Sequence, residues 1–265
     1  RTDGTLDPSI ASPALRPASF FDVEALWRTT TQDPAVASFA ISQQGTGLFA
    51  TIQAPDAAGA SRWWVVPAAT RQWSATHLIH RGDIFETRGL VLGGFVPGDA
   101  SVTRVGQAEF VFTDREHGQV TWTVGGVTRV DAVARSASSE LGCAWGGRAV
   151  AAFGTNLTGF WSDPDHPGWA LFLAGTEVEL EARWFTYDPQ GRPLVIESRL
   201  GNHFGDYDGY VHVGTKPVGS LYVGPGNGPG AGFAFEFTPD SGLPVGRQSA
   251  GVARFELTPI PTTCR

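Results

Sequence analysis

The sequence predicts an all-β protein built from two tandem antiparallel domains, each folded as an up-and-down β-barrel. Three observations support this prediction. Short segments of alternating apolar and polar residues recur along the chain between Gly-, Asp- and Pro-containing turns. Only 17% of the residues are charged, whereas Gly (34) and Phe (17) are abundant, which favours sheets and turns over surface helices rich in Lys and Glu. Finally, an aromatic run in the second half recurs, eroded, in the first half.

The first half is expected to form one domain over residues 20–137, after an extension over residues 1–19 that has Pro and Gly and little periodicity. Its strands are expected at residues 36–42, 48–53, 62–67, 76–80, 107–113 and 119–124. In the last two, alternation points Phe110 and Phe112 on one arm, and Val120 and Trp122 on the other, to a single face of a hairpin.

The second half is expected to repeat this plan over residues 158–265, after a Ser-, Ala- and Gly-rich linker over residues 138–157 that leads into it. Its strands are expected at residues 168–173, 178–187, 193–200, 210–213, 220–223, 232–238 and 251–258. Roughly seven or eight meandering strands per copy suit a barrel or a β-sandwich. We favour the barrel because closure removes exposed strand edges.

The repeat is clearest in an aromatic run of the second copy, which comprises residues 158–161, 167–171 and 182–188, followed by Gly191. Its counterpart comprises residues 26–27, 39–41 and 49–52, followed by Asp56 and Gly59, at a shift near 130 residues. Self-similarity on this scale indicates two copies of one domain. Since the first copy lacks the Pro-Gly-Trp segment, we expect any site in the second copy or at the seam between the copies.

The same run resembles a tandem β-rich module of secreted proteobacterial proteins, with the pattern G-[LF]-W, then P-G-W-[GA], then W-F-T-Y-D-x-x-G-x-P. The matching segments here are residues 159–164, 167–170 and 184–193, and residues 105–114 resemble the closing hairpin of that module. The resemblance covers most of the chain, although the sharp motif lies only in the second copy. Because the module has no established activity, the resemblance implies secretion and repetition but no catalytic residues.

Charge and cysteine content restrict the partners and the compartment. A net charge of −7 argues against a nucleic-acid partner, which requires clustered cations. No stretch approaches about 18 apolar residues, so we expect no membrane span. Cys143 and Cys264 bracket the second copy and are expected to form a disulfide, which persists in oxidising compartments; two unrelated free thiols are the alternative. The expected location is therefore the periplasm or the medium.

Aromatic residues of the second domain are the predicted ligand-binding group. At a barrel mouth, such rings could stack on a glycan or another small flat ligand; alternatively, they fill the barrel core. The residues are Trp161, Trp169, Trp184, Tyr187 and Tyr210.

A polar strand suggests a second hypothesis, in which the protein is an extracellular hydrolase or lyase. If the strand is extended, Asp206, Asp208, Tyr210 and His212 share one face, where they could act as acid and base; a solvated strand face is the alternative. Calcium is the one cofactor considered, with Asp163, Asp165, His166 and His203 as further possible metal ligands. The chain lacks nucleophile-elbow and Walker motifs. A binding protein is therefore the leading hypothesis, ahead of an enzyme and of a structural or adhesive module.

Overall fold

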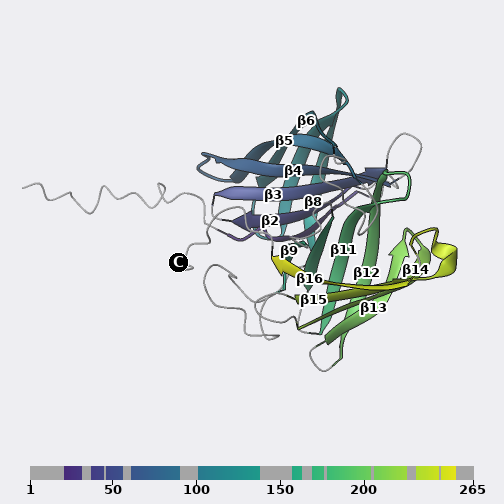
Figure 1. Ribbon diagram of the computed structural model, residues 1–265. Helices are drawn as coiled ribbons and strands as arrows, with labels where there is room; N and C mark the ends of the chain where they lie inside the picture. The colour runs from purple at the N-terminus through teal and green to yellow at the C-terminus, as the bar shows by residue number, and fades with distance from the viewer. Residues whose placement is uncertain are drawn as a thin grey trace, which may run out of the picture.

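The computed structural model contains two closed antiparallel β-barrels, which confirms the predicted all-β fold with two antiparallel domains (Figure 1). It describes residues 21–31, 37–44, 46–55, 61–89, 101–137, 157–162, 169–175, 178–203, 206–225, 231–244 and 246–254. Within these ranges, no helix is both long enough and apolar enough to cross a membrane.

The first barrel consists of eight strands in simple up-and-down order. They are β1 (Ala25–Thr29), β2 (Ser38–Gln44), β3 (Gly47–Pro55), β4 (Ser61–Gln72), β5 (Leu78–Arg88), β6 (Ser101–Phe112), β7 (His117–Val124) and β8 (Val127–Ala137). Each strand pairs with the next, and β8 returns to β1, where Trp27 lies opposite Arg135. This closure removes the edges that an open sheet would expose.

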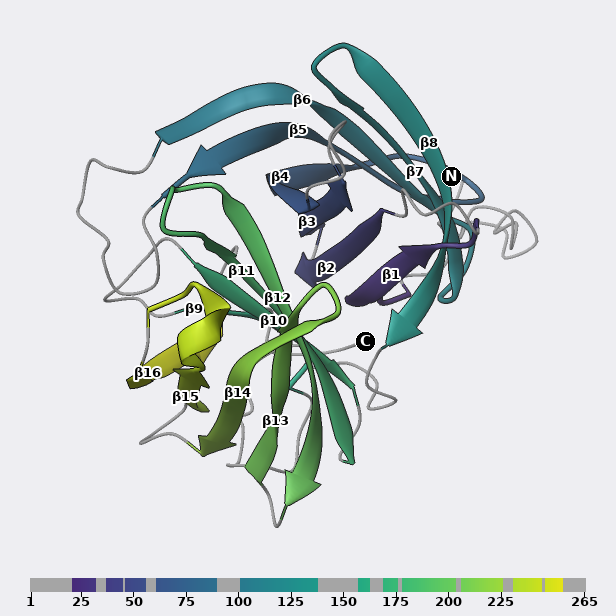
Figure 2. The ribbon, with the colours of Figure 1, turned by 90° about the vertical axis from the view of Figure 1, so that its right-hand side faces the viewer.

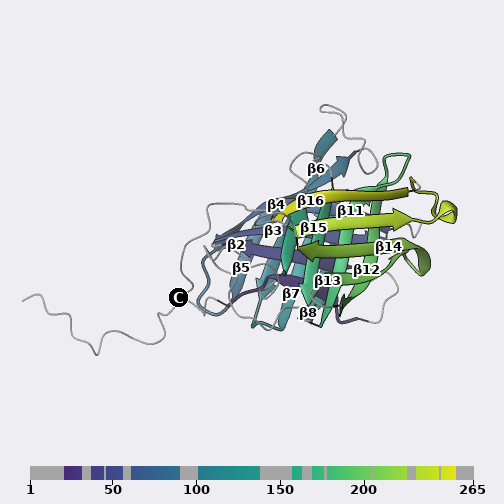
Figure 3. The ribbon, with the colours of Figure 1, turned by 60° about the horizontal axis from the view of Figure 1, so that its bottom comes forward.

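The second barrel repeats this order (Figure 3). Its strands are β9 (Gly159–Ser162), β10 (Ala170–Gly175), β11 (Glu179–Tyr187), β12 (Pro193–His203), β13 (Asp206–Val213), β14 (Lys216–Pro225), β15 (Ala231–Phe237) and β16 (Gly246–Arg254), with a short 3₁₀ turn, η3 (Pro239–Ser241), before β16. The ring is closed where β16 meets β9, with Arg254 opposite Trp161.

Alternation along the strands fills both barrels with apolar side chains. In the first barrel, Phe110 lies opposite Val120 on the next strand, and both are fully buried, as the predicted hairpin requires. Phe112 and Trp122 continue the same inward face, and Trp27 packs against Phe112 with ring centroids 4.8 Å apart.

The two barrels are equivalent copies, because the same contact recurs at the start of each. The indole nitrogen of Trp27 donates a hydrogen bond to the carbonyl oxygen of Val23 at 2.9 Å, and Trp161 donates to the carbonyl oxygen of Leu157 at the same distance. The strand register is also the same in both copies, since Trp27 lies opposite Phe39 and Trp161 lies opposite Leu171 at the corresponding position. The sequence repeat is therefore a structural duplication.

The barrels lie side by side, with β1–β4 next to β9–β12 (Figure 2). Side chains on the outward faces of these strands form a third hydrophobic cluster. We call this contact the seam. Its buried members are Leu26, Ala40, Trp63, Phe160, Phe172, Ala174, Phe185, Tyr187 and Val195. Leu26 and Phe160 are equivalent residues of the two copies, as are Ala40 and Phe172, since each pair occupies the same register position. The seam thus joins the same face of both copies.

Candidate functional site

Of the three predicted ligand-binding tryptophans, Trp161 and Trp184 lie in the core of the second barrel and Trp169 packs against it. Trp161 is 3% exposed and Trp184 is 1% exposed. The Trp184 ring contacts Trp169 at 5.7 Å and Phe235 at 4.6 Å between centroids. Trp169 is half-buried and packs against this core. In this structure, Trp161 and Trp184 fill the barrel and offer no ring face to a ligand.

The two predicted ligand-binding tyrosines lie elsewhere. Tyr187 is 3% exposed at the seam, where its ring contacts Trp63 of the first barrel and its hydroxyl hydrogen-bonds the hydroxyl of Thr87. Burial raises the pKa of Tyr187 to about 12. Tyr210 is 73% exposed on the outer wall of β13. The five aromatic residues therefore occupy the core, the seam and the outer wall, and the structure does not bring them into one pocket.

The polar strand has the predicted alternation. In β13, Tyr207 and Val211 point into the core, so Asp206, Asp208 and Tyr210 face outward together with His212. His203 of β12 joins this face, and its Nε2 lies 3.4 Å from Oδ1 of Asp208. Both side chains are more than half exposed, so the group lies on an open surface.

The remaining predicted ligands cannot be placed. Asp163, Asp165 and His166 lie outside the described residues, as do Cys143 and Cys264. The predicted calcium site and the predicted disulfide therefore stay predictions. Among the residues that are described, no group of three or more His, Cys, Asp or Glu side chains is arranged to hold a metal ion.

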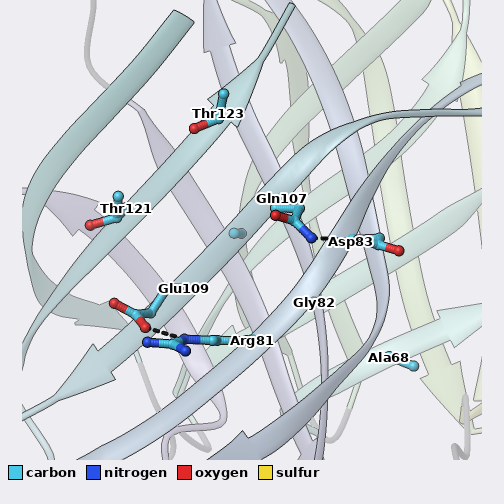
Figure 4. Close-up of a pocket in the computed structure, with 9 residues that line it drawn as sticks. Ala68, Arg81, Gly82, Asp83, Gln107, Glu109, Thr121 and Thr123 are labelled. Atoms are coloured by element: carbon cyan, nitrogen blue, oxygen red, sulfur yellow. Dashed lines mark hydrogen bonds and ion pairs between the residues drawn. The ribbon is translucent and has the colours of Figure 1, made fainter. Parts of the chain in front are cut away.

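A recess of about 580 Å³ lies on the outer wall of the first barrel, over strands β5–β7 (Figure 4). Its lining is polar and apolar in nearly equal measure and consists of Ala68, Arg81, Gly82, Asp83, Gln107, Ala108, Glu109, Thr121 and Thr123. This recess is the candidate functional site, and none of its residues was among the predicted site residues.

Strand alternation and register place the polar groups of the recess in rows. Residues Arg81 and Asp83 face outward between inward residues of β5. Asp83 lies opposite Gln107 and Arg81 lies opposite Glu109, which in turn lies opposite Thr121 on β7. The rows therefore run across three strands, each fixed by backbone pairing.

Gly82 lets strand β4 approach β5 closely beneath the recess. A Cβ at this position would lie 2.7 Å from Cγ1 of Val66, closer than real Cβ atoms come to a neighbour, and at a tight 3.0 Å from Cα of Ala69. The β4–β5 register also shifts between Val65 and Thr70. The close approach is therefore built on a glycine next to a bulged strand.

Ion pairs hold the charged groups of the recess in place. Arg81 pairs with Glu109, and Nη2 of Arg104 donates to Oδ1 of Asp83 at 2.8 Å. Gln107 also donates to Asp83, at 3.3 Å. The hydrogen bonds from Arg104 and then Gln107 hold the pKa of Asp83 below its ordinary value. Two guanidinium groups thus balance two carboxylates, which leaves an array of donors and acceptors without excess charge.

The sequence contained a signal for this array, although a weak one. The polar positions of 107–109 and 121–123 alternate with the core residues Ala108 and Trp122, so period two already places them on the outer wall. The alternation pattern does not predict the depth of the recess, because that depth depends on how β4 packs beside β5.

Comparisons of the chain with protein-family models, with curated proteins and with solved structures gave no match.

Proposed function

We propose that this is a secreted, non-catalytic binding protein whose ligand is a neutral, polyhydroxylated molecule such as a glycan. The observation that carries the proposal is the recess on β5–β7, with a volume of about 580 Å³. Small-molecule sites typically measure roughly 300–1,000 Å³. The proposed site thus lies in the first copy, whereas the aromatic run directs attention to the second.

The chemistry of the lining supports a sugar-like ligand. Each sugar hydroxyl both donates and accepts hydrogen bonds. The recess offers carboxylate acceptors at Asp83 and Glu109, an amide at Gln107, and hydroxyls at Thr121 and Thr123. Because paired strands and ion pairs fix these groups in advance, less conformational entropy is lost on binding.

The balance of charge favours a neutral ligand over an anion. Arg81 and Arg104 already hold the two carboxylates. An anionic ligand would have to displace one of these contacts, whereas a hydroxyl can bond the remaining lone pairs.

The alternative of a hydrolase or lyase has less support from the geometry. Acid–base chemistry gains most where positioned groups act in a site that excludes water. Asp208 and His203 are more than half exposed, and Tyr210 is 73% exposed. Secretion remains a prediction from the expected disulfide between Cys143 and Cys264 and from the resemblance to the secreted module.

Binding of neutral oligosaccharides, first on a glycan array and then by isothermal titration calorimetry, tests the proposal. Gln107→Ala and Thr121→Val each remove one polar group from the outer wall and leave the core unchanged. Each should weaken binding about tenfold, because a hydrogen bond contributes roughly 1–1.5 kcal/mol. Tyr210→Ala, on the second barrel, is the matched control and should bind as the unmodified protein does.

Two outcomes would overturn the proposal. One is that no neutral saccharide binds. The other is that Tyr210→Ala abolishes binding while both recess variants retain it, which would return the site to the aromatic residues of the second domain.

A further inference from the structure

A fully buried histidine lies directly beneath the proposed binding recess. His80 is 0% exposed in β5, and the next residue, Arg81, lines the recess. Its partner across the strand pair is Phe110 of β6, which follows the recess residue Glu109. The histidine and the recess therefore occupy opposite faces of the same two strands.

Within the part of the chain that the structure describes, the imidazole lacks a side-chain hydrogen bond. Neither Nδ1 nor Nε2 of His80 makes a hydrogen bond, although both are buried. A backbone contact with Thr46, in the β2–β3 turn, favours the charged form, but by less than burial and Arg71 disfavour it. A buried polar group without partners is costly even when it is neutral.

The surroundings oppose a positive charge on His80. On β4, the residue opposite is Arg71, a like charge, and on β6 it is the apolar Phe110. Burial and then repulsion from Arg71 lower the pKa of His80 from 6.5 to about 4. The imidazole is therefore neutral in the folded barrel at pH 7, and its protonation requires access to water.

We propose that protonation of His80 in acid favours local opening of β5 from β6 and so releases a ligand bound in the recess. The opening separates the rows of polar side chains that cross these two strands, which are Arg81, Asp83, Gln107 and Glu109. The effect on ligand release rests on the proposed function of the recess. The opening itself does not, because it depends only on the buried imidazole.

The expected size follows from the difference in proton affinity between the closed and open forms. With a pKa of about 4 in the closed form and 6.5 in water, the population of any open form that exposes His80 rises about twentyfold from pH 7 to pH 5. Amide exchange reports such local opening as a loss of protection.

Hydrogen–deuterium exchange of the full chain without ligand tests the proposal, with intrinsic exchange rates corrected for pH. Protection in β5 and β6 should fall about twentyfold between pH 7 and pH 5, whereas protection in β13 and β14 of the second barrel should change much less. His80→Gln and His80→Phe, which do not titrate, should both abolish this difference between the barrels.

An equal loss of protection in both barrels would overturn the proposal, as would an unchanged pH response in a folded His80 variant. If neither variant folds, the comparison of β5–β6 with β13–β14 in the unmodified chain still decides. Since no ligand is used, failure of the glycan-binding test leaves this result unaffected.

Discussion

The tryptophan that joins the two barrels offers the sharpest test of how the molecule holds together. Trp63 belongs to β4 of the first barrel, yet its partners belong to the second. It is 6% exposed, and its ring lies 5.8 Å from Phe185 and 5.4 Å from Tyr187 between centroids. Its indole nitrogen donates to the carbonyl oxygen of Thr186 at 3.0 Å. Trp63→Ala removes all of these contacts at once.

The expected cost can be worked from these contacts. Burying a Trp side chain removes roughly 200 Å² from water, which at about 25 cal/mol per Å² gives about 5 kcal/mol. The hydrogen bond adds roughly 1 kcal/mol, and partial collapse of the seam returns some of this energy. We therefore expect Trp63→Ala to cost about 3–5 kcal/mol, in line with large-to-small substitutions elsewhere. Because the contacts cross the seam, the loss falls on the coupling between barrels.

Differential scanning calorimetry measures this coupling. The unmodified chain should unfold in one cooperative transition, whereas Trp63→Ala should unfold in two, with a calorimetric enthalpy larger than the van't Hoff enthalpy. Trp63→Phe keeps a ring in the seam and should cost about 1–2 kcal/mol, mainly through the lost hydrogen bond. Trp73→Ala is the matched control, since Trp73 is 84% exposed, and should stay within about 0.5 kcal/mol. A single transition for Trp63→Ala, with a loss below about 1 kcal/mol, would refute the reasoning.

Three further predictions concern stability and can be measured by urea unfolding. The folded pKa of His80 lies below its unfolded value, so the stability that the neutral imidazole contributes is present above about pH 6.5 and lost as the pH falls towards 4. Between pH 7 and pH 4, the unmodified chain should lose about 3 kcal/mol more of its free energy of unfolding than His80→Gln does. Equal losses would contradict this prediction. Trp27→Phe and Trp161→Phe remove equivalent hydrogen bonds and should each cost about 1–2 kcal/mol; a cost at only one position would argue against equivalent roles. Arg183→Met removes the buried guanidinium that binds Glu181 and Glu197; because these carboxylates keep Arg28 and Gln53 as partners, it should cost about 1.5–3 kcal/mol. Arg199→Met breaks an exposed pair and should cost less than about 1 kcal/mol; comparable costs would mean that the ion pairs of Arg183 are effectively solvated.

The fold could be predicted from sequence because its determinants are local. Alternation assigns Phe110 and Phe112 to one face of a strand whatever the rest of the chain does. Turn residues then fix where each strand ends, and a meander without long crossovers leaves few ways to pair the strands. The duplication was visible for the same reason, since equivalent strands need equivalent patterns.

The site could not be predicted in the same way, because burial on the outer side of a sheet depends on distant partners. Trp184, Phe185 and Tyr187 are nearly adjacent in β11, yet Trp184 enters the barrel core while Phe185 and Tyr187 pack on the first barrel. Alternation predicts this division between the two faces. It does not reveal that a second barrel covers the outer face, so the sequence alone cannot distinguish the seam from a ligand-binding surface.

The seam also gives a physical reason why the two copies differ in residue size on their outward faces. Register makes Ala40 equivalent to Phe172, and Trp63 equivalent to Val195. At each of these positions, one copy carries a bulky residue and the other a smaller one. Two identical faces with large rings at every position would collide, and two with small residues would leave voids, since interiors pack at near-crystalline density. The seam therefore explains why the two copies differ at these two positions, where a large side chain of one copy packs against a smaller one of the other.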